Sequence, residues 1–453
     1  MNPTDAPRDF RARVSVNGQS APTPGPVRVD AAGVECDAGQ AGPLRVDFGE
    51  VASLTRGDLA VELNLFDGTN IRFDRGGSLD DLWDLVRARF RARVSSSLRF
   101  APTDARHTFD GRLELDAADG FAPLSAQISI TRLGLNYISD SGPCAQIPFG
   151  ALGDASFDAA GYEVTIPVEP GPAARQGARL KLSKLARRTE EFVEFYRHAH
   201  SRSRMDTARC LEGLTPVLGA GPRMALAGEL LVGRMVSRDR CDALAPGGWQ
   251  WIWDAAAGTE RTPYREALQG LAGSAARLWL GLRPYGGVPR DSANGADSAV
   301  PEDSGPAASV PDDAAGADAV AADSGVEDSN FPVVYAAALL QGVSPATDRL
   351  VLEVLSEADH ATYVYRITPA PAELSRDDAG AWLAATASYT LLALDFKKEP
   401  LYLPEPELLS TREGLYRAAL RRLPGLREMR SRLVGRAIHS SPDAWMVRIE
   451  TLK

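Results

Sequence analysis

Catalytic signatures are missing from this chain of 453 residues. It contains neither the H-E-x-x-H motif of zinc peptidases nor the G-x-S-x-G motif of serine hydrolases. Gly219-Ala220-Gly221 opens like a dinucleotide-binding fingerprint, but Met224 stands where the third glycine is needed. No glycine-rich run ends in Lys-Ser or Lys-Thr, so the other common phosphate-binding loop is missing as well. We therefore predict no catalytic residue and no cofactor.

Histidine and cysteine are scarce, with five and four residues respectively. His198 and His200 are two positions apart on a predicted helix end, so they do not share a helix face. His360 falls in a predicted hairpin turn. The cysteines have no paired spacing, and we interpret them as reduced, apolar side chains. We therefore predict no metal site. The cysteines are Cys36, Cys144, Cys210 and Cys241.

Long apolar runs are also absent. The chain has no run of about 18 apolar residues, the length that a membrane-spanning helix needs. Its first residues, MNPTDAPRDF, lack the basic region and apolar core of a secretory signal. We therefore expect a cytoplasmic protein. The richness in alanine and arginine with few lysines is typical of a GC-rich bacterial genome.

Basic and aromatic residues are absent from 291–330, which carries ten acidic residues among many alanines, glycines, serines and prolines. Such a segment cannot bury enough apolar surface to offset the entropy of ordering, so we predict a disordered acidic linker over 287–330. Its ten charges equal the net charge of −10 of the whole chain. Because the remainder is close to neutral, we do not expect nucleic acid as a partner.

The most informative feature that is present is an internal duplication. Residues 10–94, the first repeat, recur nearly ungapped at about 109–203, the second repeat. Apolar residues alternate with period two in both copies, which predicts half-buried strands. We therefore predict two copies of one β-rich module. The clearest matches join 10–18 to 109–117, and VDFGEV at 46–51 to IPFGAL at 147–152.

Each repeat changes to helix periodicity at its end. In the first, Leu79, Leu82, Trp83, Val86 and Phe90 fall on one stripe after a cap at Ser78; in the second, the stripe contains Phe192, Val193 and Tyr196. Asp67-Gly68 predicts a hairpin turn. Gly33 and Gly134 occupy matching positions that we expect to need positive φ.

This arrangement of about seven short strands, the [V/I]-x-F-G-x-[V/L] motif and a closing helix resembles the pleckstrin-homology-like fold, which is found in tandem in bacterial proteins. The resemblance covers less than half of the chain and implies a fold without an activity. Members that bind phosphoinositides carry lysines and arginines on and between their first two strands. Here that loop reads NGQSAPTPG in the first repeat and DAADGFAPLS in the second, so we do not expect phosphoinositide binding. The resemblance instead implies protein interaction through exposed sheet edges or the groove beside the helix.

Beyond the repeats, we predict an α+β organisation. Residues 204–286 form a predicted helical segment, with helices over 225–236 and 264–282. We predict a C-terminal α+β domain over 331–453, with a final strand at 445–449. The first and second repeats define predicted domains at 1–100 and 101–203. The other strands predicted in the C-terminal domain cover 333–343, 350–355 and 361–367, and the helices cover 379–394 and the region from 411 onward.

Two groups of side chains are candidate interaction residues. Three tryptophans alternate within GGWQWIWD, a pattern that serves either as a core plug or as an interface anchor. An arginine-rich segment over 412–436 serves either as a solvated basic face or as a docking surface for an acidic partner, including the acidic linker of this chain. The candidates are Trp249, Trp251, Trp253, Arg417, Arg421, Arg422, Arg427 and Arg430.

We therefore expect a non-enzymatic scaffold or adaptor that binds other proteins, with the acidic linker tethering two folded halves. Two alternatives remain open. A chaperone of basic proteins or a nucleic-acid-associated factor would use the acidic linker. An enzyme in the C-terminal domain would have to use Asp359, His360, Tyr363 or the arginines.

Overall fold

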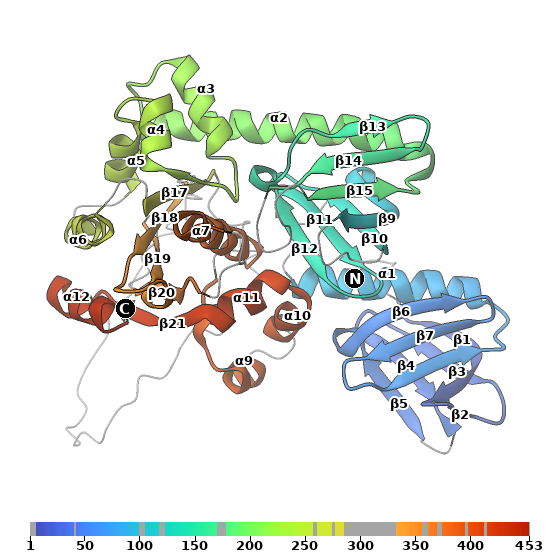
Figure 1. Cartoon of the computed structure of the whole chain (residues 1–453). Helices are drawn as coiled ribbons and strands as arrows, with labels where there is room; N and C mark the ends of the chain where they lie inside the picture. The colour runs from blue at the N-terminus through green and yellow to red at the C-terminus, as the bar shows by residue number, and fades with distance from the viewer. Residues whose placement is uncertain are drawn as a thin grey trace, which may run out of the picture.

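The chain forms a mixed α+β structure with three antiparallel sheets, none closed into a barrel, and twelve helices in the part of the chain that is described (Figure 1). The computed structural model describes residues 6–39, 42–98, 105–116, 123–169, 178–256, 261–273, 277–284, 332–355, 361–368, 374–394, 397–411 and 415–452. The predicted linker, 287–330, and the residues Asp359 and His360 lie outside the described residues.

The first sheet belongs to the first repeat, in the order β5-β4-β3-β1-β8-β7-β6 with β2 beside β1. The hairpin predicted at Asp67-Gly68 is confirmed, since β7 pairs with β8 around it. The strands are β1 (Arg8–Val16), β2 (Gln19–Ser20), β3 (Gly25–Val29), β4 (Gly33–Asp37), β5 (Pro43–Asp47), β6 (Val51–Gly57), β7 (Ala60–Leu65) and β8 (Asn70–Asp74), and helix α1 (Leu79–Ser97) follows them.

The second sheet belongs to the second repeat and has the matching order β12-β11-β10-β9-β15-β14-β13. The register matches too: Phe10 pairs with Val27 in the first repeat, and Phe109 pairs with Ile128 in the second. Phe10 and Phe109 open the first stretches that the sequence alignment matched, so the duplication is confirmed. The strands are β9 (Thr108–Asp116), β10 (Leu124–Ile130), β11 (Gly134–Ser139), β12 (Cys144–Pro148), β13 (Ser156–Asp158), β14 (Glu163–Pro167) and β15 (Arg179–Ser183), before helix α2 (Thr189–Leu214).

Gly33 and Gly134 are needed for a close approach between strands. A Cβ atom on Gly33 would lie 1.9 Å from the carbonyl oxygen of Val46, and one on Gly134 would lie 2.0 Å from that of Ile147. The prediction that Gly33 requires positive φ is wrong, because the limit there is space. The two glycines are nevertheless equivalent, as the alignment predicted.

We expect Gly33→Ala to lower the free energy of unfolding by about 2 kcal/mol, because β4 and β5 must separate to admit the methyl group. Gly57→Ala is the control, since its nearest contact would be 3.9 Å away, and it should change stability by less than about 0.5 kcal/mol. Urea unfolding of both variants measures the difference. Equal stability of the two variants would contradict the steric explanation.

The third sheet has the order β16-β17-β18-β19-β20-β21. Its central strand β18 is buried along its whole length, since odd and even residues pack into different cores on the two faces. Helix α7 covers one face, and α6 and α12 contribute to the other (Figure 1). The strands are β16 (Met235–Ser237), β17 (Leu278–Arg283), β18 (Val333–Leu340), β19 (Arg349–Val354), β20 (Ala361–Arg366) and β21 (Leu433–Ile438).

The helices of this third region lie before, between and after its strands. Those before β17 are α3 (Ala220–Glu229), α4 (Arg238–Leu244), α5 (Gly248–Ala256) and α6 (Thr262–Ala272). Those after β20 are α7 (Arg376–Ala393), α8 (Glu399–Tyr402), α9 (Glu405–Thr411), α10 (Leu415–Arg422), α11 (Pro424–Arg432) and α12 (Pro442–Thr451).

The separation between 204–286 and 331–453 needs correction. Leu278 of β17 pairs with Ala338 of β18, so both segments contribute strands to one sheet, and the predicted linker connects two adjacent strands. The expectation that it tethers two separate folded halves is therefore wrong. The boundary at 203 also falls inside the continuous helix α2.

Three predicted elements differ from those observed. The helix predicted over 264–282 ends at Ala272, where Gly273 has φ 69°, and the apolar run LWLGLR is the strand β17. The helix predicted over 225–236 ends at Glu229 and is followed by β16. Residues 445–449 belong to a helix because Ser441 caps it and Pro442 opens it. Periodicity alone does not show whether a short apolar run forms a helix or a strand.

Candidate interaction sites

The tryptophan triplet is mainly a core element. Trp249 and Trp253 are buried in α5 and stack with ring centroids 5.5 Å apart, whereas Trp251 is half-buried against Gly247. The helix brings positions 249 and 253 onto one face because they are four residues apart. The interpretation as a core plug therefore fits Trp249 and Trp253, and the two are not accessible to a partner.

The arginine-rich segment docks within the chain. Arg417 and Arg421 of α10 both donate hydrogen bonds to Glu50, which lies between β5 and β6 of the first repeat. Although burial opposes it, the hydrogen bonds from Arg421 and Arg417 hold the pKa of the Glu50 carboxyl below its usual range. For these two arginines, the predicted acidic partner is thus a glutamate of the same chain.

Arg422 lies at the centre of this intramolecular interface and is 1% exposed. Its Nη2 donates to the carbonyl oxygen of Val51, and its guanidinium lies 5.0 Å from the ring centroid of Phe90. Burial lowers the pKa of the guanidinium. Arg430 donates to the carbonyl oxygens of Pro400 and Leu403. Of the predicted arginines, Arg427 is exposed.

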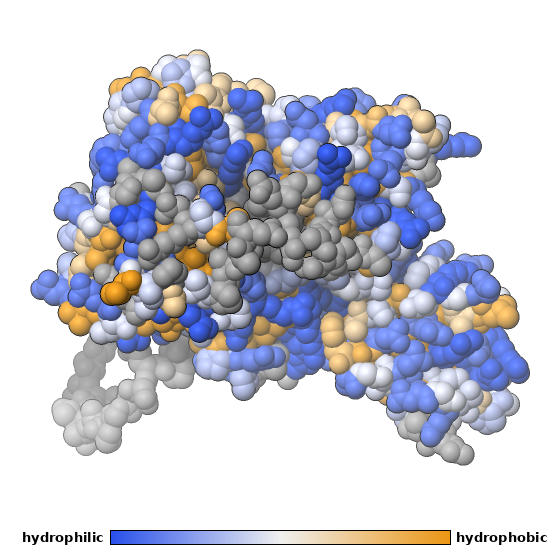
Figure 2. All heavy atoms as spheres, in the orientation of Figure 1, coloured by the Kyte–Doolittle hydropathy of each residue, from blue (hydrophilic) through white to orange (hydrophobic). Residues whose placement is uncertain are grey.

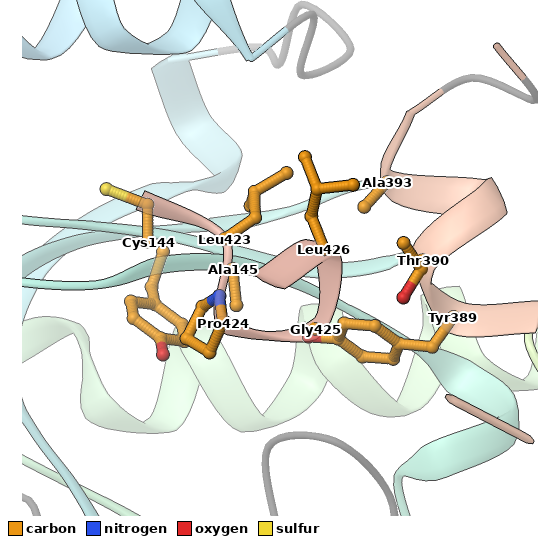
Figure 3. A pocket seen from close by; sticks show the side chains of 10 residues that line it. Cys144, Ala145, Tyr389, Thr390, Ala393, Leu423, Pro424, Gly425 and Leu426 are labelled. Atoms are coloured by element: carbon orange, nitrogen blue, oxygen red, sulfur yellow. The ribbon is translucent and has the colours of Figure 1, made fainter. Parts of the chain in front are cut away.

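A small cavity marks the junction of the second repeat with α7 and α11 (Figure 3). Its volume is about 50 Å³, enough for a few water molecules but too small for an organic substrate. Figure 3 shows Tyr389 of α7 beside Gly425 of α11 and Cys144 on the opposite side. Burial raises the pKa of the Cys144 thiol, so this thiol lacks the acidity of a nucleophile. We interpret the cavity as a packing gap.

A buried acid lies among polar side chains on one face of the third sheet. Glu353 of β19 is 1% exposed, and its Oε1 lies 3.5 Å from Nε2 of His439. His439 Nε2 also lies 2.7 Å from Oγ1 of Thr362, and its ring stacks on Tyr264 at 4.4 Å. Burial raises the pKa of Glu353 to about 7. No cavity among those described opens onto this cluster, so we do not assign it a substrate.

The largest cavity described lies on the first repeat. It is an open groove of about 900 Å³ between the start of β1 and the start of α1, and it is the feature that we call the β1–α1 groove. Beyond Ala12, β1 pairs with β8, but within the described ranges its first residues pair only with β3, so one of their backbone edges is unpaired beside the groove. Gly77 has no atom within 4 Å of an ideal Cβ position. The lining residues are Arg8, Asp9, Phe10, Arg11, Pro26, Gly76, Gly77, Ser78, Leu79, Asp81 and Leu82.

The rest of the visible surface offers fewer features. On the face in Figure 2, hydrophilic side chains predominate and hydrophobic ones occur in small groups. The exposed large hydrophobic residues, including Leu59, Tyr162 and Val217, are scattered singly along the chain. In the described parts of the chain, no cluster of three metal-ligating side chains occurs, and no helix is long and apolar enough to cross a bilayer.

Sequence reasoning named the groove beside the helix as an interaction surface but did not name its residues. The sequence contains a signal for these residues: when the repeats are aligned at the start of each helix, the small Ser78 corresponds to the large Arg188. Reasoning from motifs also missed Glu353, which lies in an apolar strand and gains its character from burial. Tyr363, considered for an enzyme, is buried and stacks with Tyr402 at 5.6 Å.

Comparison with known proteins assigns no family to this chain. No family model matches it, and no curated protein has a significant match to it. Any function must therefore be inferred from the β1–α1 groove and from the architecture that holds it.

Proposed function

We propose that the protein is a non-enzymatic adaptor built on two pleckstrin-homology-like modules, and that it binds a partner polypeptide in the β1–α1 groove of the first repeat. The observation that carries this proposal is the open groove of about 900 Å³ beside a backbone edge that no described strand pairs. An unpaired edge offers hydrogen bonds to any extended polypeptide, and the groove offers room for its side chains.

The architecture supports the modular part of the proposal. The two repeats share seven antiparallel strands in the same order, the first having the short β2 in addition, and each is followed by a helix, which is the arrangement that the resemblance implies. The repeats contact each other, and the first repeat also contacts the third region. Arg91 of α1 forms ion pairs with Asp140 and Asp110 of the second repeat, and the arginines of α10 bind Glu50. The groove therefore sits on a fixed platform.

Site-specific photocrosslinking in the native cell tests the proposal. A photoreactive residue in place of Gly77, which has open space beside it, should crosslink to a discrete partner protein. Two control positions are available in the same chain: Arg187, the exposed equivalent in the second repeat, and Leu59, which is 75% exposed. Neither control should capture that partner, because neither lies at the groove. The purified partner should then bind the unmodified chain.

Crosslinks of equal pattern at all three positions, or none at position 77, would refute the groove as a docking site.

A further inference from the structure

The second repeat fills the place that is empty in the first. There, Arg188 precedes α2 and donates from Nη1 to the carbonyl oxygen of Thr108 at 2.8 Å. Its Nε donates to Oε2 of Glu191 at 2.7 Å, and its guanidinium lies 4.2 Å from the ring centroid of Phe109. One arginine side chain is thus held by a carboxylate, by backbone carbonyl oxygens and by an aromatic face.

The repeats match around this arginine, with one extra residue, Ala186, between the last strand and the helix of the second repeat. Phe10 is equivalent to Phe109, because each pairs with a matching residue of the next strand. Ser78 is equivalent to Arg188, because each is the residue that precedes the helix. Three positions into the helix, Asp81 is then equivalent to Glu191. The buried pairs Leu82 with Phe192 and Val86 with Tyr196 support this helix register.

The first repeat therefore keeps the groups that hold the arginine but lacks the arginine. Phe10 and Asp81 line the groove, and so does Asp9, whose carbonyl is equivalent to that of Thr108. Asp80 pairs with Arg56, but among the described residues Asp81 has no ion-pair partner. Arg11 also lines the groove, and its Nη2 donates instead to the carbonyl oxygen of Pro24 at 3.4 Å.

A second replacement lies beside the groove. Leu185 of the second repeat is 3% exposed and packs over Gly111 of β9. At the equivalent place the first repeat has Gly76, whose ideal Cβ would lie 2.8 Å from the carbonyl oxygen of Arg11. The backbone itself therefore closes the place of the leucine, whereas the loss of the arginine side chain leaves the groove open with its acidic and aromatic groups retained.

We infer that the β1–α1 groove binds the guanidinium of an arginine from a partner polypeptide, which takes in trans the place that Arg188 takes in cis. This inference rests on the proposed function and adds the chemistry of the partner. A guanidinium matches the retained groups better than an ammonium does, because its planar fork donates to carboxylate and carbonyl oxygens while its face stacks on a ring. The partner segment therefore contains an accessible arginine.

A peptide with one arginine among glycines and serines is the probe, and saturation-transfer NMR with the full chain measures its binding. A matched peptide with citrulline keeps the shape but loses the charge, so we expect it to bind at least about tenfold more weakly. Asp81→Asn should weaken the arginine peptide about three- to fivefold, since the ion pair is exposed to solvent. Equal binding of the two peptides would overturn the inference.

Ser78→Arg provides the sharpest variant, because it recreates the residue of the second repeat and fills the groove from within. It should abolish detectable binding of the arginine peptide while the protein stays folded. Glu191→Gln is the matched control in the second repeat and should leave peptide binding unchanged. If Ser78→Arg instead folds normally and binds the peptide as the unmodified chain does, the inference is wrong.

The two proposals fail in different ways. If a partner crosslinks at position 77 but the arginine and citrulline peptides bind equally well, the groove remains a docking site and the inference of a guanidinium site is wrong. If the arginine peptide binds specifically but no partner crosslinks at position 77, the guanidinium site remains and the proposed adaptor function is wrong.

Discussion

Replacing Glu353 with glutamine should stabilise the protein at pH 8 by about 3 kcal/mol and should have little effect below pH 4.5. The carboxyl is buried, which raises its pKa from 4.5 to about 7, although Arg261, Lys398 and Arg265 act in the opposite direction. A shift of one pKa unit corresponds to about 1.36 kcal/mol, so this shift costs about 3 kcal/mol when the group is ionised. Glutamine has nearly the same shape and carries no charge.

The direction of the pH dependence follows from proton binding. Between pH 4.5 and about 7, the folded protein keeps a proton on Glu353 that the unfolded chain has released. Stability therefore falls as pH rises through this interval, and the loss is complete above the folded pKa. Below pH 4.5 the carboxyl is protonated in both states, so its contribution to pH dependence disappears.

Urea unfolding of the unmodified chain and of Glu353→Gln at pH 5, 6, 7 and 8 measures this effect. The difference in stability between the two proteins should grow with pH. Glu35→Gln is the control, since Glu35 is an exposed carboxylate of β4 that lies 3.6 Å from Arg45. Its effect should be below about 0.5 kcal/mol at every pH. A stability difference for Glu353→Gln that is independent of pH would contradict the buried ionisation.

Arg422→Ala should lower the free energy of unfolding by about 3 kcal/mol. The substitution leaves a cavity between α10 and the first repeat, and it removes the donor that satisfies the carbonyl oxygen of Val51. It also removes the guanidinium from the rings of Phe66 and Phe90, at 5.3 and 5.0 Å. Because these groups lie in the first repeat, the loss should weaken its attachment to the third region.

Arg422→Met separates packing from charge. Methionine fills most of the volume, and it removes a buried cation for which the described part of the chain provides no ion-pair carboxylate. We therefore expect a loss of only about 1 kcal/mol. Arg427→Ala, at an exposed position of α11, is the control and should be neutral within about 0.5 kcal/mol. Equal losses for the alanine and methionine variants would show that the hydrogen bond and charge, rather than packing, hold this interface.

The internal docking of the arginines changes how the chain can act as an adaptor. Arg417, Arg421 and Arg422 already bind the first repeat, so they are not available to a separate acidic partner. The strands on either side of the predicted linker pair directly, so the two segments that it joins are parts of one sheet. The proposed adaptor therefore presents its groove from a connected body and does not rely on a tether between two halves.

The sequence by itself determined the duplication and, for the first half of each repeat, the register between the copies. These features are local or repeated: alternation with period two defines each strand, and a constant offset relates Val34 to Leu135 and Val46 to Ile147. It also determined the equivalence of Gly33 and Gly134. The candidate tryptophans were open to two interpretations, because a single helix pattern fits both a core and an interface.

Only the tertiary structure decided which side chains meet across the chain. The strand β17 pairs with β18 in a sheet whose two faces are both covered. An apolar run such as LWLGLR does not reveal whether it forms a strand of this kind or a buried helix. Burial of Glu353, and the contact of Arg422 with the first repeat, likewise arise from elements far apart in sequence. The groove is open because Ser78 stands where the second repeat has an arginine, and the space this leaves depends on how β1 and α1 pack.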